Sequence, residues 1–293
     1  MPDDAVPEAE PLASEPLTAA TLEGAQIAVA VVGPDGDATT FGDATQSFRL
    51  ASVTKLLTAY ACLVATEEGT LCLDEAAGPP GATVRHLLAH AAGYDFDIGL
   101  RSSPGLRRIY SNTGFDVLGD HLARRAGMAA VDYVVAAVVE PLGLTDTDFR
   151  DGSVAHGAWS TAADLGRFGA ELLAPALVHP DTLAEATRVQ FPGLNGVLPG
   201  IGPQSPNDWG LGFELRDHKT PHWTGRRNSP STFGHFGASG TFCWVDPDIT
   251  RCLVVLTDRP FGPWALDAWP QLSDTVVDAA LAARRGLPES GPS

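Results

Sequence analysis

The feature that most constrains the fold is the placement of two different periodicities along the chain. Apolar, β-prone runs lie near both ends, whereas the stretch from about residue 83 to 175 has the spacing of amphipathic helices. Strands of one sheet must therefore come from distant parts of the sequence. This order predicts an α/β fold of the α+β type: an antiparallel β-sheet built from N- and C-terminal segments and flanked by helices, with a mostly helical inserted lobe and a cleft between the two.

The individual elements follow from local patterns. Runs at 26–32 and ending near residue 42 surround a Gly-Pro-Asp-Gly turn, which predicts a hairpin. Residues 50–68 predict a buried helix closed by Gly69. Amphipathic spacing predicts further helices at 84–90, 113–126, 131–139 and 162–173, and a closing helix at about 273–285. Strands are expected at 210–215, 232–236, 240–245 and 251–257.

Length and composition indicate how these elements are grouped. The chain has 293 residues and is 44% hydrophobic, which is enough apolar material for a sizeable core. Residues 1–16 are acidic and rich in proline, which predicts a solvated tail. We expect 17–289 to form a single domain, with a sheet lobe at about 25–50 and 207–287 and a helical lobe at about 70–205.

Charge and targeting patterns narrow the function classes. The net charge of −17 repels phosphate backbones and anionic membranes, so neither nucleic acid nor membrane is expected as a partner. The N-terminus lacks the basic and apolar regions of a secretory signal, and no run approaches the ~18 apolar residues of a membrane span, which predicts a cytoplasmic protein. The four cysteines lie in apolar runs without CxxC spacing and are predicted to be core thiols; whether Cys243 and Cys252 bond is left open.

The scarcity of lysine singles out one short motif. Two of the 19 basic residues are lysines, and one of them, Lys55, follows Ser52 by three positions on the predicted buried helix. At this spacing the two side chains share a helix face, and the helix N-terminus favours developing negative charge. A desolvated lysine loses its proton more easily than arginine does and can accept the serine proton. The alternative is an N-capping serine beside a surface lysine.

Two further motifs follow in order, Tyr110-Ser111-Asn112 before a helix and Gly234-His235-Phe236-Gly237 at a strand end. Together with flanking strings such as TVRHLLAHAAGY, STAADLGRF and GHFGASGTFCWVDP, the chain over roughly 25–285 resembles the serine β-lactamase and penicillin-binding DD-peptidase superfamily. The likeness is greatest to its branch of class C β-lactamases, DD-carboxypeptidases and related esterases.

The resemblance implies a role for each motif. Ser52 would be the nucleophile, with Lys55 and Tyr110 jointly moving its proton. Asn112 would bind Lys55 and a substrate amide.

In the third motif, His235 takes the place of the Lys or His of the family, in the H-x-G triple that ends at Gly237. The backbone N–H of Ala238 would form an oxyanion hole with that of the nucleophile. Read singly, these residues could instead be an ordinary half-buried tyrosine, a helix N-cap and a satisfied core histidine.

The sequence departs from the family pattern in the middle of the third motif. Phe236 stands where β-lactam-recognising relatives usually carry a threonine, whose hydroxyl helps to bind the substrate carboxylate; Ser239, Arg226 or Arg227 could compensate. His218 and His222 are predicted to be solvated in a polar loop. His86 and His90 are four apart on a predicted helix, but without a third ligand we expect no metal site.

These observations predict a serine hydrolase that needs no cofactor. It would acylate Ser52 with an ester or amide, such as a β-lactam, a D-amino peptide or a short acyl ester, and deacylate with water. The partner is expected to be this small molecule, and the oligomeric state is left open. The alternatives are an acyltransferase with the same acyl-enzyme and a non-catalytic binding or scaffold protein of the same fold.

Overall fold

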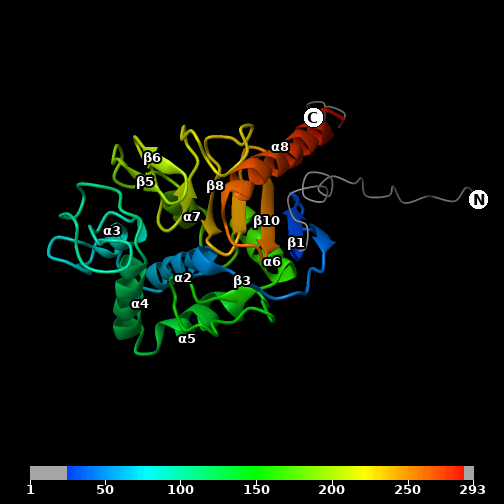
Figure 1. Cartoon of the computed structure of the whole chain (residues 1–293). Helices are drawn as coiled ribbons and strands as arrows, with labels where there is room; N and C mark the ends of the chain where they lie inside the picture. The colour runs from blue at the N-terminus through cyan, green and yellow to red at the C-terminus, as the bar shows by residue number, and fades with distance from the viewer. Residues whose placement is uncertain (1–24, 287–293) are drawn as a thin grey trace, which may run out of the picture.

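A six-stranded antiparallel sheet with the order β2-β1-β10-β9-β8-β7 forms the centre of the molecule (Figure 1). The computed structural model describes residues 25–286. The strands are β1 (Ile27–Val32), β2 (Ala38–Gly42), β7 (Glu214–Leu215), β8 (Phe233–Gly237), β9 (Thr241–Asp246) and β10 (Arg251–Thr257). Strands from both ends of the chain thus share one sheet, and the predicted fold class is confirmed.

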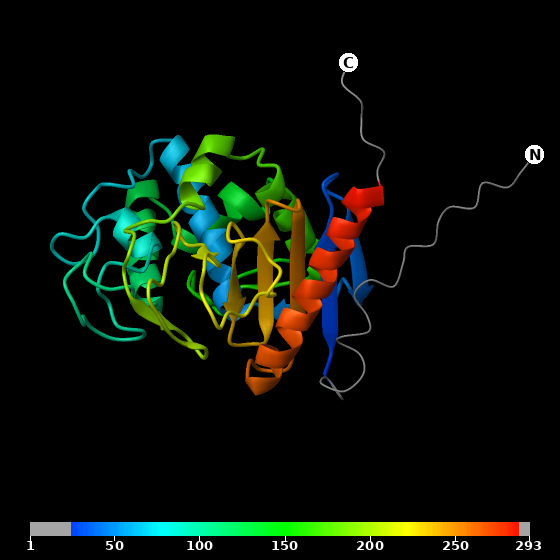
Figure 2. The ribbon, with the colours of Figure 1, turned by 90° about the horizontal axis from the view of Figure 1, so that it is seen from above.

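Helices cover both faces of this sheet. The long helix α8 (Pro263–Gly286) lies on one face, and α6 (Ala162–Leu173) with α2 (Thr54–Glu67) on the other (Figures 1 and 2). The remaining helices are α3 (Val84–Leu88), α4 (Asn112–Ala126), α5 (Ala130–Val134) and α7 (Pro180–Ala186), with the short 3₁₀-helix η1 (Ala51–Val53) and the short π-helix η2 (Val135–Val139). Two small ladders pair β3 (Phe48–Arg49) with β4 (Trp159–Ser160) and β5 (Gly196–Leu198) with β6 (Gly202–Gln204).

Alternation along the central strands explains this layering. In β10, Cys252 and Val254 pack into the core on the side of α2 and α6, whereas Leu253 and Val255 pack into the core under α8. Successive side chains of a strand point to opposite faces, so a strand covered on both sides must be apolar throughout. This requirement is why the apolar runs could be recognised as strands.

Element boundaries agree with the predictions where the periodicity is strong. The predicted and observed limits coincide for α6 and β10, and Gly69 has the positive φ of 76° expected after α2. The closing helix α8 begins at Pro263, ten residues before the predicted start. Strand β7 is shorter than predicted because Gly212, with a φ of 81°, turns the chain there. The predicted tail 1–16 and the outermost parts of the predicted domain lie outside the described residues.

Among the helices that the structure describes, none is both long and apolar enough to cross a bilayer.

Candidate active site

Ser52 lies in η1, at the point where the chain enters the buried helix α2. The residue before it, Ala51, has a left-handed φ of 47°, which is uncommon for a residue with a side chain. Such backbone strain persists where the surrounding structure holds it in place and often occurs at functional sites. Residues 54–65 of α2 are buried without interruption, so Lys55 enters the protein interior while Ser52 remains partly exposed.

Lys55 makes three polar contacts and has no exposed surface. Its Nζ lies 2.7 Å from Asn112 Oδ1, 2.8 Å from the Ala155 carbonyl oxygen and 3.4 Å from Ser52 Oγ. A neutral amine has two N–H groups and one lone pair. The two shorter contacts are to groups that can only accept, so they match the two N–H groups and leave the lone pair for the serine hydroxyl.

Electrostatics favour this neutral form. Burial lowers the pKa of Lys55 to about 7, while the negative charges of Asp116 and Asp97 act in the opposite direction. The uncharged form of Lys55 is therefore far more accessible at neutral pH than that of an exposed lysine.

Tyr110 lies just before α4, enclosed by aromatic rings. Its ring centroid is 4.6 Å from that of His90 and 5.5 Å from that of His235, and Lys55 Nζ is 4.9 Å from it. Within residues 25–286 its buried hydroxyl has no hydrogen-bond partner. Burial raises the pKa of Tyr110, and the nearby Ser52 hydroxyl opposes this only in part. The resting side chain is thus a neutral phenol, able to give a proton more readily than to take one.

His235, on β8, is neutral and has one free acceptor. Its Nδ1 lies 2.6 Å from the Phe236 carbonyl oxygen, which requires the proton on Nδ1, and the buried Nε2 has no partner within the described part of the chain. Burial, together with the smaller effect of Lys55, lowers the pKa of His235 to about 3. The side chain therefore presents a lone pair, whereas a lysine at this place would present a cation.

Gly237 allows β8 to lie directly against the turn that carries Ser52. A Cβ at this position would come within 2.3 Å of the Leu50 carbonyl oxygen and 3.2 Å of the Ala51 Cβ. Any side chain would therefore push β8 away from η1. The close approach leaves Ala238 and Ser52 on the wall of one cavity.

This inner cavity has a volume of about 240 Å³ and mostly apolar walls. Ser52, Tyr110 and His235 line it together, so the structure brings residues of all three motifs to one place. The remaining walls are Phe96, Leu198, Pro199, Gly200, Trp209, Glu214, Phe236, Ala238 and Phe261. Asn112 does not line the inner cavity, but its Oδ1 accepts a hydrogen bond from Lys55.

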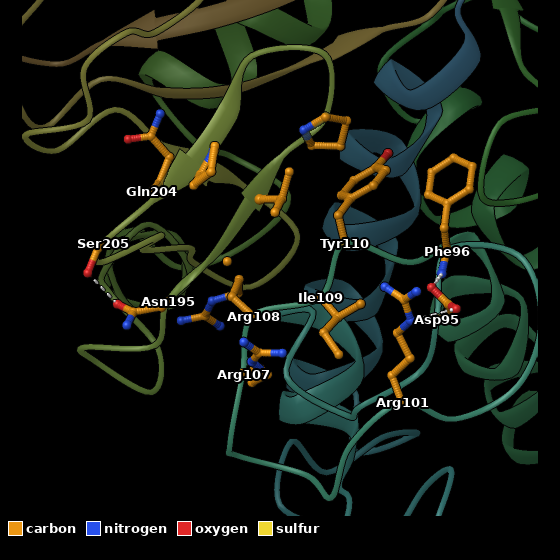
Figure 3. A pocket seen from close by; sticks show the side chains of 14 residues that line it. Asp95, Phe96, Arg101, Arg107, Arg108, Ile109, Tyr110, Asn195, Gln204 and Ser205 are labelled. Carbon is orange, nitrogen blue, oxygen red and sulfur yellow. Dashed lines mark hydrogen bonds and ion pairs between the residues drawn. The ribbon is translucent and has the colours of Figure 1, made fainter.

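A larger outer cavity of about 730 Å³ adjoins the inner one and does not include Ser52. The two share Phe96, Tyr110 and Pro199. The segment from Asp95 to Tyr110 forms one side, and the β5–β6 hairpin with its flanking residues forms the other (Figure 3).

A family model described as Beta-lactamase matches residues 18–275, which is most of the chain. The chain belongs to the beta-lactamase family. The resemblance predicted from the three motifs is therefore confirmed.

Solved structures of similar proteins agree with this assignment. A beta-lactamase from Mycobacterium bovis is 54% identical with a TM-score of 0.85, over 87% of this chain and 95% of that one. Unliganded simvastatin synthase from Aspergillus terreus is 18% identical with a TM-score of 0.71, over 91% and 95% of the two chains, and shows the same fold.

The chain is also similar to a protein that is named as a carboxypeptidase. The protein "Putative D-alanyl-D-alanine carboxypeptidase" of Salmonella paratyphi B is 26% identical over 211 residues, which cover 57% of this chain and 48% of that protein. This beta-lactamase-family chain thus spans about half the length of the curated relatives it matches.

One buried polar cluster beside the inner cavity was missed by the sequence analysis. Glu214 accepts hydrogen bonds from Lys219 and, at 2.6 Å, from Trp223 Nε1, and His222 Nε2 lies 2.9 Å from it. Burial alone would raise the pKa of Glu214, but His222 and Lys219 outweigh it and hold the pKa at about 2. The prediction of a solvated His222 was wrong, because this side chain is buried against the carboxylate. The rarity of lysine could have pointed to Lys219 as it did to Lys55.

The residues predicted to compensate for Phe236 do not reach either cavity. Arg227 pairs with Asp278 at 2.7 Å on α8, and the Ser239 hydroxyl donates to the Arg49 carbonyl at 2.7 Å. Arg226 lies beside Arg227, with its carbonyl accepting from Arg216. The loop that carries both arginines packs toward α8 and away from the cavity walls.

The cysteine prediction was partly wrong, since Cys72 is exposed while the other three are buried. Cys243 and Cys252, on neighbouring strands, are free thiols with their sulfur atoms 3.8 Å apart.

His86 and His90 do not share a helix, because α3 ends at Leu88 and His90 has a left-handed φ of 54°. His90 accepts a hydrogen bond from the Ser111 N–H at 3.3 Å and its ring packs at a tilt against that of Tyr110, so it helps to position Tyr110. Between residues 25 and 286, no three His, Cys, Asp or Glu side chains converge as metal ligands.

Proposed function

We propose that the protein is a serine hydrolase in which Ser52 forms an acyl-enzyme with an ester or amide substrate. The observation that carries the proposal is the set of three contacts of Lys55, which leaves the lone pair of a neutral amine for the serine hydroxyl. A base whose pKa is lowered to about 7 is well matched to proton transfer near neutral pH.

In the proposed acylation, Ser52 Oγ attacks the substrate carbonyl carbon while its proton passes to Lys55 Nζ. The carbonyl oxygen becomes an oxyanion, which accepts hydrogen bonds from the backbone N–H groups of Ser52 and Ala238. The bond to the leaving oxygen or nitrogen then breaks. Tyr110 gives its proton to the leaving group and regains one from Lys55, so the serine proton ends on the released alcohol or amine.

Deacylation uses Lys55 again, with water in place of Ser52 as the attacking group. A water molecule gives a proton to neutral Lys55 as its oxygen bonds to the acyl carbon. The bond from that carbon to Ser52 Oγ then breaks, and Oγ takes up the proton. A carboxylic acid leaves, and both Lys55 and Ser52 return to their starting states.

The inner cavity favours an uncharged, apolar acyl group. Its walls are mainly aromatic and aliphatic, His235 offers a lone pair instead of a cation, and the ionised Glu214 lies at its edge. Phe236 supplies no hydroxyl where β-lactam-recognising relatives have one. We therefore favour a short or medium acyl ester over β-lactams and D-amino peptides, whose carboxylate is bound in relatives with the help of the missing hydroxyl.

Covalent labelling tests the proposal. Intact-mass measurement after incubation with a fluorophosphonate should show one adduct on the wild-type protein and none on Ser52→Ala. Benzylpenicillin, used in parallel, should label much more slowly. An unmodified wild-type mass, or equal labelling of the variant, would refute the hydrolase proposal and favour the non-catalytic alternative. Product analysis of an acyl ester with added alcohol separates hydrolysis from acyl transfer.

A further inference from the structure

Arginine side chains gather around the outer cavity of this strongly acidic protein. Arg101, Arg107 and Arg108 all line it, although the whole chain has 19 basic residues against 36 acidic ones. In Figure 3, Arg107 and Arg108 lie toward Asn195 on the β5–β6 side, whereas Arg101 lies beside Asp95 on the side of Phe96 and Tyr110. The cavity wall thus carries three arginines and one carboxylate, Asp95, in a chain whose net charge is −17.

Arg108 contributes a buried positive charge that has no direct ion-pair partner among residues 25–286. The side chain is 1% exposed, and its guanidinium donates to the carbonyl oxygens of Asn207, Ala89, Gln190 and Phe191 at 2.5–3.1 Å. These acceptors satisfy its N–H groups but carry no net charge. Among residues 25–286 no carboxylate forms an ion pair with Arg108. Asp208 lies near enough to act on its charge but offsets it only in part, so Arg108 still contributes a positive potential to the adjoining cavity.

Arg107 adds a second cation that is exposed to the cavity. Like Arg108, it has no ion-pair partner within the described chain, and its side chain is exposed. Arg101 differs, because Asp95 pairs with it at 2.9 Å and offsets its charge. A free guanidinium beside a buried cation is a favourable place for a carboxylate or phosphate group, which it can bind through two parallel hydrogen bonds.

The position of Tyr110 relates this region to the proposed reaction. Tyr110 lines both cavities, and it is the residue proposed to protonate the leaving group. A leaving group in reach of the phenol therefore extends into the outer cavity, whereas the acyl group occupies the inner one.

We propose that the outer cavity binds an anionic group, a carboxylate or a phosphate, on the leaving-group side of the substrate, with Arg107 as its direct contact. The proposal rests on the hydrolase function proposed above. It assigns the two ends of the substrate opposite characters: an uncharged acyl group inside and an anion outside.

A matched pair of esters tests it. 4-Butyryloxy-3-nitrobenzoate differs from 2-nitrophenyl butyrate by one carboxylate on the leaving phenol. After correction for their rates with hydroxide, we expect kcat/KM to favour the anionic ester about tenfold at low ionic strength and less in 0.5 M NaCl. Arg107→Gln should reduce this ratio toward one. Arg227→Gln removes the same charge at a site away from both cavities and should leave the ratio unchanged. A wild-type ratio near one, or the same ratio in Arg107→Gln, would overturn the proposal.

A binding measurement separates failure of this inference from failure of the hydrolase proposal. Calorimetry with Ser52→Ala should detect 4-hydroxy-3-nitrobenzoate binding at least tenfold more tightly than 2-nitrophenol, and Arg107→Gln in that background should abolish the difference. This result requires no turnover. Phenyl phosphate and benzoate, compared as competitors of the nitrobenzoate, identify the preferred anion, and failure of both to compete would contradict an anion site.

Discussion

Replacing Asn112 by aspartate tests the role of Lys55 with a nearly isosteric change. The Asn112 Oδ1 atom lies 2.7 Å from Lys55 Nζ, so the substitution puts a carboxylate oxygen where a neutral carbonyl oxygen now accepts. An adjacent negative charge stabilises the protonated lysine and raises its pKa. If neutral Lys55 is the base that activates Ser52, activity must move to higher pH.

The size of the shift follows from this distance. Two unit charges 2.7 Å apart attract by about 6 kcal/mol at an effective dielectric constant of about 20, which sets an upper limit of about four pH units. The shift of the Lys55 pKa is smaller than this limit because the new carboxylate is partly buried. Asp97, 3.3 Å from the Asn112 amide nitrogen, would also repel it. Opposite charges at such contacts typically shift a pKa by about one to three units. We expect about two, from about 7 to about 9.

The rate of fluorophosphonate labelling between pH 5 and 10.5 is a suitable assay, since the departing fluoride needs no proton from Tyr110. The wild-type rate should rise to a plateau with a midpoint near pH 7. In Asn112→Asp the midpoint should lie near pH 9, with labelling at pH 7 reduced about fiftyfold and largely recovered at pH 10. Asn112→Ala, which removes the acceptor without adding charge, should not move the midpoint upward. An active Asn112→Asp variant with an unmoved midpoint would refute the assignment of Lys55 as the base.

Three other substitutions probe the same architecture. Lys55→Met should change how the free energy of unfolding depends on pH. Folding lowers the pKa of Lys55, so between pH 7 and 10.5 the unfolded wild-type chain holds a proton that the folded protein has released. The stability of the wild-type protein therefore rises with pH in this range. Urea unfolding should show wild-type gaining about 3 kcal/mol more than the variant from pH 6 to 9, and parallel curves would contradict a buried neutral lysine. Tyr110→Phe should slow hydrolysis of an ethyl ester about 100-fold, but that of a nitrophenyl ester much less, because nitrophenolate leaves unprotonated; equal losses in kcat/KM would argue against proton donation. Lys219→Met leaves the buried Glu214 carboxylate without its cation and should lower the free energy of unfolding by about 3–5 kcal/mol, whereas a loss below 1 kcal/mol would mean that the ion pair contributes little.

The parts of the fold that could be predicted are those whose pattern is enforced by burial. The limits of α6 and β10 were predicted correctly because a helix packed on a sheet and a strand covered on both faces leave strong periodic signals. The short elements α7, β5 and β6 were missed, since three to seven residues carry too little periodicity. His179-Pro180 does place a proline at the first helical position, a local signal for the start of α7.

The candidate site likewise contains residues that could be predicted from the sequence and residues that could not. Ser52 and Lys55 are linked by helical spacing, and the second and third motifs were found through their order along the chain. The cavity walls had no such signal, because Phe96, Leu198 and Phe261 come from separate loops that only the tertiary structure brings together. Arg108 was missed for a similar reason: its four acceptors come from three distant segments, and none is visible as a pattern near it in the sequence.

The two lysines show where sequence reasoning reaches its limit. Both are buried, so the preference of this chain for arginine on the surface does identify interior lysines. Burial lowers the pKa of each, but the neighbours differ. Lys55 donates to an amide and a backbone carbonyl, which do not offset its charge, and its pKa falls to about 7. Lys219 lies against the Glu214 carboxylate, which counteracts the effect of burial and makes the lysine part of an ion pair. Rarity therefore predicts that a lysine is buried, and the charge of its nearest acceptor then decides whether it can serve as a base.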